Sequence, residues 1–193
     1  MQTVTRVGMP LADYLQRYDE APFEIIDGTV IPMSPTKFGH NYVTHLIFLA
    51  LYSFVTPGGQ WKVFMETPFI KPGRDDPNWV EGSLVPDIML LRADKLAGYT
   101  AATPDWREKP LPVVPDLVVE IVSPTDRYSD VYRKIERYFE LGVQIIWLVD
   151  PLRKKVTVHR AGKDQQSILG EEATLTGDDL LPGSSIPVKS LFE

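Results

Sequence analysis

The chain has 193 residues, of which 44% are hydrophobic and 24% are charged, a composition typical of a globular protein and not of a disordered tail or a coiled coil. The absence of cysteine excludes disulfides, thiolate catalysis and zinc–thiolate centres. A formal net charge of −6 argues against a general nucleic-acid coat but is compatible with a local basic groove.

No apolar run of about 18 residues is present, so we expect no membrane span. The N-terminus lacks the basic start and apolar segment of a signal peptide, and a cytoplasmic protein is therefore expected. Because the sequence contains no internal repeat, low-complexity tract or linker, residues 1–193 are predicted to form a single domain.

A helix and a hairpin are the first elements expected. Residues 9–20 carry apolar side chains at helical spacing, which predicts a short amphipathic helix covering a sheet edge. Residues 23–26 and 29–33 then form two predicted strands, joined by an Asp27-Gly28 turn. Glu24 lies in the first strand, where spacing alone favours a side chain that faces solvent.

Residues 38–55 form the most apolar helix candidate, which ends before Pro57-Gly58-Gly59. This segment is too short and too interrupted for a transmembrane helix. His40 lies near its start, where a histidine either caps and packs the helix or contacts a metal or substrate. The side chains expected to face a core are Tyr42, His45, Leu46, Leu49 and Phe54.

The middle of the chain is predicted as strand, loop, strand and loop. Residues 61–71 form one expected strand, and residues 74–83 a polar loop. In the next strand, residues 84–91, Asp87 directly follows a proline, which places this carboxylate near the strand start, an edge or a bulge. A structural role for Asp87 competes with a functional one. Residues 92–115, rich in proline and charge, are predicted as a long irregular connection bordering a site or an interface.

Residues 117–123 form an apolar strand candidate with Glu120 in its middle. Apolar residues on both faces of this strand indicate that both faces are buried. An unpaired buried carboxylate is heavily penalised or becomes neutral, so we expect Glu120 to meet a cation. The alternative is a surface strand on which Glu120 faces water.

Strand geometry restricts which carboxylates can act with Glu120. Asp116 shares its face but lies about 13 Å away at ~3.3 Å per residue, too far to bind the same ion. Asp87 approaches Glu120 if their strands are neighbours, since adjacent strands lie ~4.8 Å apart. Such an Asp–Glu pair suits Mg²⁺ or Mn²⁺, with the backbone carbonyl of Ile121 as a further oxygen ligand.

An amphipathic helix and a second apolar strand follow Ser123-Pro124. At ~100° per residue, Val131, Ile135 and Tyr138 share the buried face of this helix. Lys134 lies at the margin, where its ammonium can reach a site beside the strand end or its stem can simply cover apolar surface. A short strand over residues 155–160 and a closing strand and turn complete the chain.

The order helix, strand, strand with Pro86-Asp87, strand with Glu120, helix, strand resembles the αβββαβ core of the PD-(D/E)xK nuclease superfamily. The run PDLVVEIVSPTD, the Tyr-Arg-Lys that follows, Tyr138, Gly142-Val143 and the final WLVDP are similar to the widespread bacterial putative restriction endonuclease family (Uma-type), also known as a domain of unknown function. The segments FEIIDGTVIPMSP, with His40, and LLPGSSIPVKSLF fit as well. The resemblance implies an α/β (α+β) restriction-endonuclease-like fold, with a mixed central sheet flanked by helices and an N-terminal hairpin.

The resemblance also implies site residues. Asp87 and Glu120 correspond to metal ligands on a sheet face that binds a phosphodiester, and Glu24 and His40 match family positions as auxiliary site residues. The lysine of the superfamily stands two residues after the glutamate, where this chain has Val122. The family pattern suggests that Lys134 replaces it from the following helix. Arg127, next to Lys134 on the helical wheel, is placed to hold a neighbouring phosphate.

The leading interpretation is a Mg²⁺- or Mn²⁺-dependent DNA endonuclease that forms a homodimer, because cutting two strands needs two active sites. One alternative is a non-catalytic nucleic-acid-binding or interaction module that retains the fold, which Val122 and the acidic balance favour. Another is a structural homodimer whose interface uses exposed aromatic residues such as Trp79 and Trp106. No base-reading motif is present, so the sequence does not separate DNA from RNA.

Overall fold

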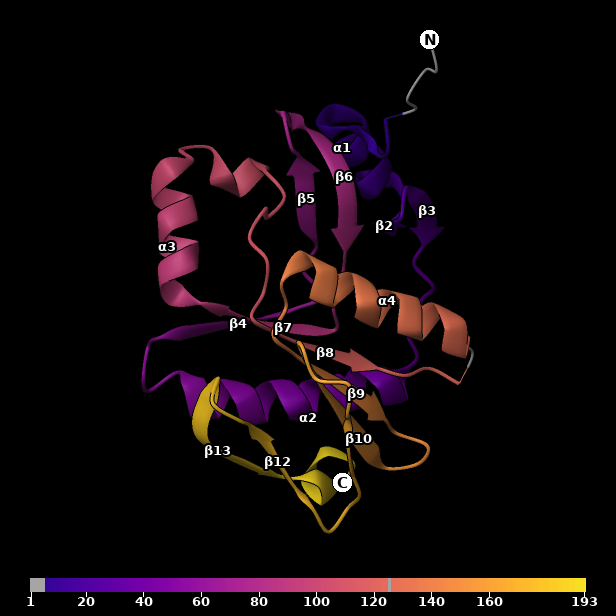
Figure 1. Ribbon diagram of the computed structural model, residues 1–193, viewed down its shortest axis with the longest axis vertical. Coiled ribbons are helices and arrows are strands. Elements are labelled where there is room, and N and C mark those ends of the chain that lie inside the picture. The colour runs from indigo at the N-terminus through magenta and orange to yellow at the C-terminus, as the bar shows by residue number, and fades with distance from the viewer. Residues whose placement is uncertain (1–5, 125) are drawn as a thin grey trace.

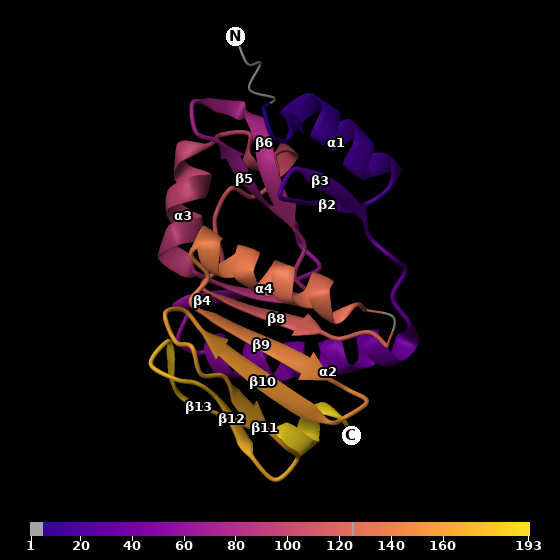
Figure 2. The same cartoon turned by 45° about the vertical axis from the view of Figure 1, so that its right-hand side comes forward.

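The computed structural model describes residues 6–124 and 126–193. Its helices are α1 (Leu11–Glu20), α2 (Phe38–Val55), α3 (Ala93–Ala102) and α4 (Tyr128–Leu141), with 3₁₀ helices η1 (Trp106–Glu108) and η2 (Val188–Leu191). They pack with a six-stranded, a five-stranded and a two-stranded sheet, and Figures 1 and 2 show the five-stranded sheet beyond α4 from the six-stranded one. In the described part of the chain, no helix is long and apolar enough to cross a membrane.

The six-stranded sheet forms the centre of the fold. Its order is β11-β10-β9-β8-β7-β4, and only the β8–β9 pair among the described strands is parallel. The elements α2, β4, β7, β8, α4 and β9 follow the predicted αβββαβ order, with β5 and β6 inserted after β4 and with α3 and η1 inserted after β7. The expected α+β fold with a mixed sheet is therefore confirmed. The bounds of the strands are β4 (Trp61–Met65), β7 (Ile88–Arg92), β8 (Leu117–Ile121), β9 (Ile145–Asp150), β10 (Lys155–Arg160) and β11 (Ser167–Leu169).

Helices α2 and α4 cover opposite faces of this sheet (Figure 1). Val119 and Trp147 pack on the α2 side, whereas Val118 and Ile146 pack under α4. Both faces of β8 are therefore buried, as its sequence predicts. Helix α4 ends at Leu141, and the following Gly142 has a φ of 106°, which allows the left-handed turn that caps the helix.

The five-stranded sheet contains β1 (Met9–Pro10), β2 (Phe23–Ile26), β3 (Thr29–Pro32), β5 (Phe69–Gly73) and β6 (Asp76–Leu84). The predicted β2–β3 hairpin is confirmed, and positive φ angles at Asp27 and Gly28 (51° and 76°) match a tight type I′ turn. Helix α1 forms as predicted, but it covers the sheet face and not the edge. Tyr14 bonds Ser83 of β6 at 2.7 Å and packs on the ring of Phe23 in β2.

Three predicted segments differ from the structure. Residues 61–71 form two strands in different sheets because the chain turns between them, with Glu66 at a φ of 46°. Most of the expected loop over residues 74–83 belongs to the long strand β6, whose polar first half is exposed or half-buried and whose end is buried. The connection over residues 92–115 contains α3 and η1, since its prolines follow α3 and do not interrupt it.

The buried side of α2 also differs from the prediction. Val43, Ile47, Leu51 and Val55 face the sheet, while the predicted core residues are exposed or half-buried. A helix that is apolar on all sides gives no polar face from which the buried stripe can be inferred. The misplaced residues are Tyr42, His45, Leu46, Leu49 and Phe54.

The C-terminal segment forms a hairpin where the sequence predicts one closing strand. Strands β12 (Thr174–Gly177) and β13 (Leu181–Pro187) pair with each other. Leu175 and Ile186 add to the core on the α2 side of the central sheet. The hairpin therefore extends the core that supports the back of the site.

The two tryptophans proposed for an interface are half-buried. The guanidinium of Arg6 lies 4.0 Å from the ring centroid of Trp79, and that of Arg107 lies 4.5 Å from the ring of Trp106. Because each indole is covered by a cation of its own chain, the expectation of exposed aromatic rings at these positions is wrong.

Candidate active site

A cleft of about 760 Å³ opens between α4, the β2–β3 hairpin and the start of α2. Side chains from both larger sheets reach it, because β2 belongs to one and β7 and β8 to the other. All the residues singled out from the sequence line it, namely Glu24, His40, Asp87, Glu120, Ile121, Arg127 and Lys134. The fold therefore gathers in one place residues that are widely separated along the chain.

Asp87 and Glu120 lie beside each other on neighbouring strands. Strands β7 and β8 pair antiparallel with Ile88 opposite Val119, so the residue before Ile88 is level with the residue after Val119. The backbone N–H of Ile121 donates to Asp87 Oδ2 at 2.6 Å. Asp87 stands directly before β7, at the strand start as predicted, and its carboxylate contacts the strand that carries Glu120.

His40 reaches the other oxygen of the same carboxylate. Its Nε2 lies 3.3 Å from Asp87 Oδ1, and both side chains are about 15% exposed. The hydrogen bond to Asp87 raises the pKa of His40 against the opposing effect of burial. Of the two alternatives for this histidine, the structure places it in the cleft and not in a purely capping position.

Lys134 is held among oxygen atoms from three segments. Its Nζ lies 2.9 Å from Glu120 Oε1 and 2.9 Å from Glu24 Oε1, and it donates to the carbonyl of Val85 at 3.3 Å. Tyr138, one helical turn further along α4, donates its hydroxyl to Glu120. Glu120 thus meets a cation, and the alternative in which it faces water is wrong.

Glu24 is buried, contrary to the expectation from its spacing. Phe23 and Ile25 pack under α1, while Glu24 points to the opposite face, into the cleft. Its Oε1 also accepts the backbone N–H of Val85 at 2.8 Å. The expectation fails because the second face of β2 lies against the site and not against water.

The proton affinities follow from this crowding. Burial raises the pKa of Glu120 above its usual range, and Lys134 opposes that rise. Burial disfavours the ammonium of Lys134, but Glu120 and Glu24 outweigh it and raise the pKa of Lys134. Burial, followed by the charge of Glu120, also raises the pKa of Tyr138. Lys134 is therefore a permanent positive charge at ordinary pH.

The oxygen atoms of these carboxylates are of the type that a hard divalent cation prefers. Within residues 6–124 and 126–193, no group of three or more His, Asp or Glu side chains surrounds a common metal position. Mg²⁺ commonly takes only one or two protein carboxylates and completes its shell with water and substrate phosphate. Asp87 and Glu120 stay the predicted pair of metal ligands, and the carbonyl of Ile121 stays a predicted third oxygen.

Asp116 serves the opposite end of the central sheet. It is buried and accepts hydrogen bonds from Lys95 Nζ at 2.6 Å, the backbone N–H of Arg92 at 3.0 Å and Gln144 Nε2 at 3.1 Å. These contacts tie α3 to the ends of β7 and β9. The structure agrees with the strand-length argument, which separates Asp116 from the site of Glu120.

Tyr138 is the contact that the sequence did not predict. Its place on the buried face of α4 is confirmed, but its hydroxyl was not expected to bond Glu120. The spacing contains a signal, because residues four apart on a helix are neighbours on one face. Tyr138 therefore lies on the same side of α4 as Lys134, and both side chains reach Glu120.

An αβββαβ core with carboxylates on two adjacent central strands and a lysine beside them defines a nuclease-like protein. The chain matches the model of the Uma2 family, described as putative restriction endonuclease, over residues 11–189, and it belongs to that family. It is also similar to the crystal structure of a putative nuclease belonging to DUF820 from Anabaena variabilis. That match has a TM-score of 0.75 and 22% identity, and it covers 95% of this chain and 97% of the other. A comparison with curated proteins gives no match.

Proposed function

We propose that the protein is a Mg²⁺- or Mn²⁺-dependent endonuclease that hydrolyses phosphodiester bonds of DNA. The observation that carries this proposal is the position of Lys134, whose Nζ lies 2.9 Å from Glu120. The strand itself offers only Val122 two residues after Glu120, and Val122 lines the same cleft. The helix thus supplies the cation that the strand lacks.

The charge balance of the cleft supports a divalent cation there. Of the carboxylates that line it, those of Glu24, Asp87 and Glu120 lie around the ammonium of Lys134 and the imidazole of His40. The other charged residues of the cleft wall are Lys37, Asp126, Arg127, Asp130 and Arg133. When Glu24, Asp87 and Glu120 are all ionised, they outnumber Lys134 and His40 even with His40 protonated, and burial raises the pKa of Glu120 in the absence of a further cation. Buried excess charge is costly without a counter-ion, and Mg²⁺ or Mn²⁺ bound at Asp87 and Glu120 provides one.

Each side chain has a distinct part in the proposed reaction. When bound, the metal polarises the phosphate and lowers the pKa of an attacking water. Lys134 keeps its proton and stabilises the negative charge that develops on the phosphate or orients that water. Tyr138 and Val85 fix the positions of Glu120 and Lys134 through their hydrogen bonds. Arg127, at the cleft wall, is placed to hold a neighbouring phosphate.

Cleavage of supercoiled plasmid tests this proposal. We expect nicking with Mn²⁺ or Mg²⁺, none with EDTA, and a rate at least about 100-fold lower in Glu120→Gln, because the metal and Lys134 lose the charge that holds them. Glu136→Gln is the matched control, since Glu136 is an exposed residue of α4, and it should nick like the wild type.

Equal metal-dependent nicking by wild type and Glu120→Gln would contradict the assignment of the site. If the folded protein bound DNA but did not cut it in the presence of any metal tested, the non-catalytic binding module would take the place of the nuclease. Circular dichroism of each variant establishes that the comparison concerns folded protein.

A further inference from the structure

We propose that a second cavity, on the opposite side of α4 from Lys134, binds an unpaired base of a nucleic-acid strand whose phosphates lie at the candidate active site. This inference rests on the proposed function and deepens it, because it names a substrate with a single-stranded segment. Tyr132 and Phe139 point into this cavity. On a helical wheel both lie more than 100° from Lys134, so one helix serves both sites.

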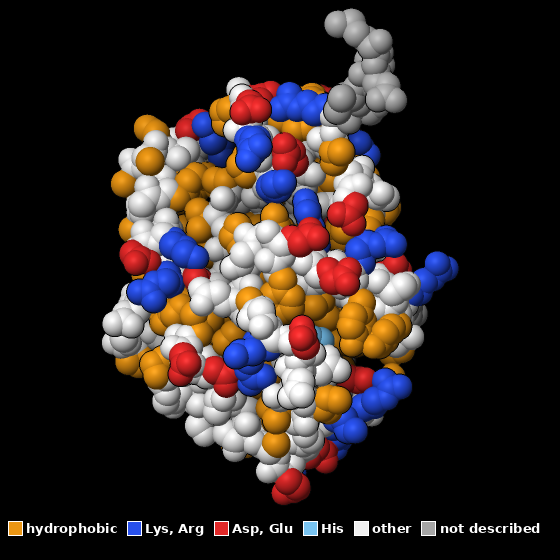
Figure 3. All heavy atoms as spheres, viewed as in Figure 1, with side chains coloured by type: hydrophobic (Ala, Val, Ile, Leu, Met, Phe, Trp, Pro, Cys, Tyr) orange, Lys and Arg blue, Asp and Glu red, His pale blue; other side chains and the backbone are white. Residues whose placement is uncertain are grey.

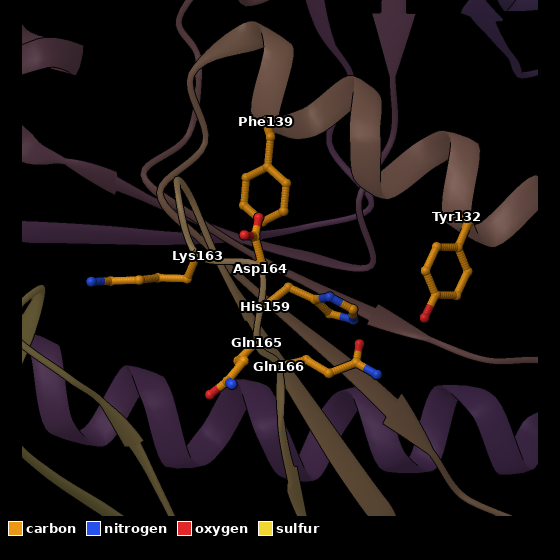
Figure 4. Close-up of a pocket in the computed structure, with 7 residues that line it drawn as sticks. All are labelled: Tyr132, Phe139, His159, Lys163, Asp164, Gln165 and Gln166. Carbon is orange, nitrogen blue, oxygen red and sulfur yellow. The ribbon is translucent and has the colours of Figure 1, made fainter.

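The cavity has a volume of about 500 Å³, within the range of small-ligand sites. Helix α4 contributes the aromatic rings of Tyr132 and Phe139, and β10 contributes the imidazole of His159, as Figure 4 shows. The loop after β10 closes the remaining side with polar residues, and the side chain of Gln166 extends in the direction of Tyr132 (Figure 4). This loop contributes Lys163, Asp164, Gln165 and Gln166.

His159 is the observation that points to a ligand. Its side chain lies in the cavity wall although only 9% of the residue is exposed, and its Nε2 has no hydrogen-bond partner among the described residues. Burial lowers its pKa, so the ring is neutral at pH 7 and can donate or accept a hydrogen bond. Nε2 is shielded from solvent in this conformation, and a buried polar atom without a partner is costly. A small rotation of the imidazole towards a ligand in the cavity would give Nε2 a partner and remove this cost.

A nucleobase matches the chemistry of these walls. Aromatic rings offer stacking surfaces to any base, and glutamine amides both donate to and accept from base edges. The neighbouring Lys163 and Asp164 carry opposite charges, which does not favour a free anion. A purely apolar ligand would leave the imidazole and the amides without partners.

The start of α4 connects this cavity to the candidate active site. Arg127 lines the active-site cleft, and the next residue, Tyr128, is 75% exposed. The rings of Tyr128 and Tyr132 lie 4.4 Å apart, and Tyr132 meets His159 edge-on at 6.3 Å. Lys134 follows Tyr128 by six positions, about 9 Å along the helix. A strand leaving the cleft at Arg127 therefore meets aromatic rings that lead to the cavity.

The surface around α4 agrees with recognition by stacking more than by charge. Figure 3 shows Lys and Arg side chains interspersed with Asp and Glu over this face, with hydrophobic side chains between them. Non-specific phosphate binding is strongest where basic residues cluster. On a face of mixed charge, a base-binding cavity gives a strand an anchor that its phosphates alone do not provide.

Binding of single-stranded oligonucleotides tests the proposal. The probes are a fluorescein-labelled oligothymidylate, the same strand with one 2-aminopurine, and a strand of equal length made of abasic units, all with EDTA to prevent cleavage. We expect quenching of 2-aminopurine on binding and much weaker binding of the abasic strand. Tyr132→Leu should raise the Kd at least about tenfold and Tyr132→Phe should not, because only leucine removes the stacking ring.

Gln166→Ala is the second variant, because Gln166 is exposed and its loss should leave the fold intact. We expect it to raise the Kd about three- to tenfold, the value of one hydrogen bond. The inference is overturned if the abasic strand binds as tightly as the base-containing one, if no strand binds, or if neither Tyr132→Leu nor Gln166→Ala changes the Kd.

Plasmid nicking with Mn²⁺, measured in parallel, separates the two proposals. If the protein nicks plasmid but binds abasic and base-containing strands equally, the proposal of a base-binding cavity fails and the proposal of a nuclease stands. If binding depends on bases and on Tyr132 but no metal supports nicking, the proposal of a base-binding cavity stands and the proposed catalytic function fails.

Discussion

Lys134 on α4 and Glu24 on β2 form an ion pair of 2.9 Å that joins the helix over the central sheet to the five-stranded sheet. The Lys134 side chain is 18% exposed and that of Glu24 is 11% exposed. The same ammonium contacts Glu120. The candidate site is thus also a link between the two sheets, and changes to it affect both stability and chemistry.

Glu24→Gln tests this link. The change removes one of two carboxylates around a buried ammonium and weakens the bond to the N–H of Val85, so we expect a loss of about 1–3 kcal/mol in the free energy of unfolding. Urea denaturation measures this loss. The control is Glu108→Gln, at an exposed glutamate, which should change stability by less than about 0.5 kcal/mol. A Glu24→Gln variant as stable as the control would show that Glu120 alone holds Lys134.

The position of the lysine is testable by moving it. Lys134→Met should lower nicking at least about 100-fold, because no other ammonium contacts Glu120 in the described part of the chain. Val122→Lys introduced into this variant should raise the nicking rate at least about tenfold above that of Lys134→Met, since Val122 lines the cleft two residues after Glu120. Rates under single-turnover conditions measure the recovery. A double variant no more active than Lys134→Met would indicate that the two positions are not equivalent.

Acid should weaken the contact between Arg160 and Asp178. Arg160 on β10 donates to both oxygens of Asp178 in the turn before β13, and this hydrogen bonding lowers the pKa of Asp178. The unfolded chain, with an ordinary pKa near ~3.9, binds the proton more tightly. The stabilisation is therefore present above the unfolded pKa and disappears as the pH falls through the lower, folded pKa.

Asp178→Asn measures this effect, since asparagine also tolerates the positive φ of 49° found there. Wild type should exceed the variant by about 1 kcal/mol or less at pH 7, because the pair is about one-third exposed. The difference should be smaller at pH 3 than at pH 7, as measured by urea denaturation at both values. A difference that grows on acidification would reverse the assigned direction of the pKa change.

The central sheet and its carboxylates could be predicted because local signals determine them. Both faces of β8 are apolar in sequence, so Glu120 was predicted to be a buried charge that needs a partner. The helical wheel placed Lys134 at the margin of the apolar stripe of α4. The burial of Glu24 required knowing that a second sheet stands against the cleft. The role of Tyr138 required the distance between two elements, which periodicity does not contain.

The predictions from composition were wrong for segments whose buried and exposed faces do not differ in polarity. Helix α2 has no charged residue, so its buried and exposed sides look alike in sequence. Strand β6 has enough polar residues to resemble a loop, although Val80 and Leu84 are buried. In both segments the packing partner, and not the local pattern, decides which side chains face the core.

The exposed side of α2 leads to the last prediction, the homodimer expected from the sequence. Phe38, Tyr42, Leu49 and Tyr52 are exposed, and with His45 they follow the alternating spacing of four and three residues that places side chains along one helix face. The stripe carries no Lys, Arg, Asp or Glu. Two copies related by a two-fold axis would bring identical stripes together without repulsion between like charges, and we propose that they do so.

Sedimentation equilibrium at micromolar concentration checks this dimer. The wild type should have twice the chain mass, and Leu49→Glu should be monomeric, because two buried carboxylates would then face each other across the axis. Thr100→Glu, on α3, is the matched control and should stay dimeric. If the dimer aligns two active sites, Leu49→Glu should also nick plasmid while losing the linear product of double-strand cleavage. A monomeric wild type, or a dimer that survives Leu49→Glu, would remove α2 as the interface.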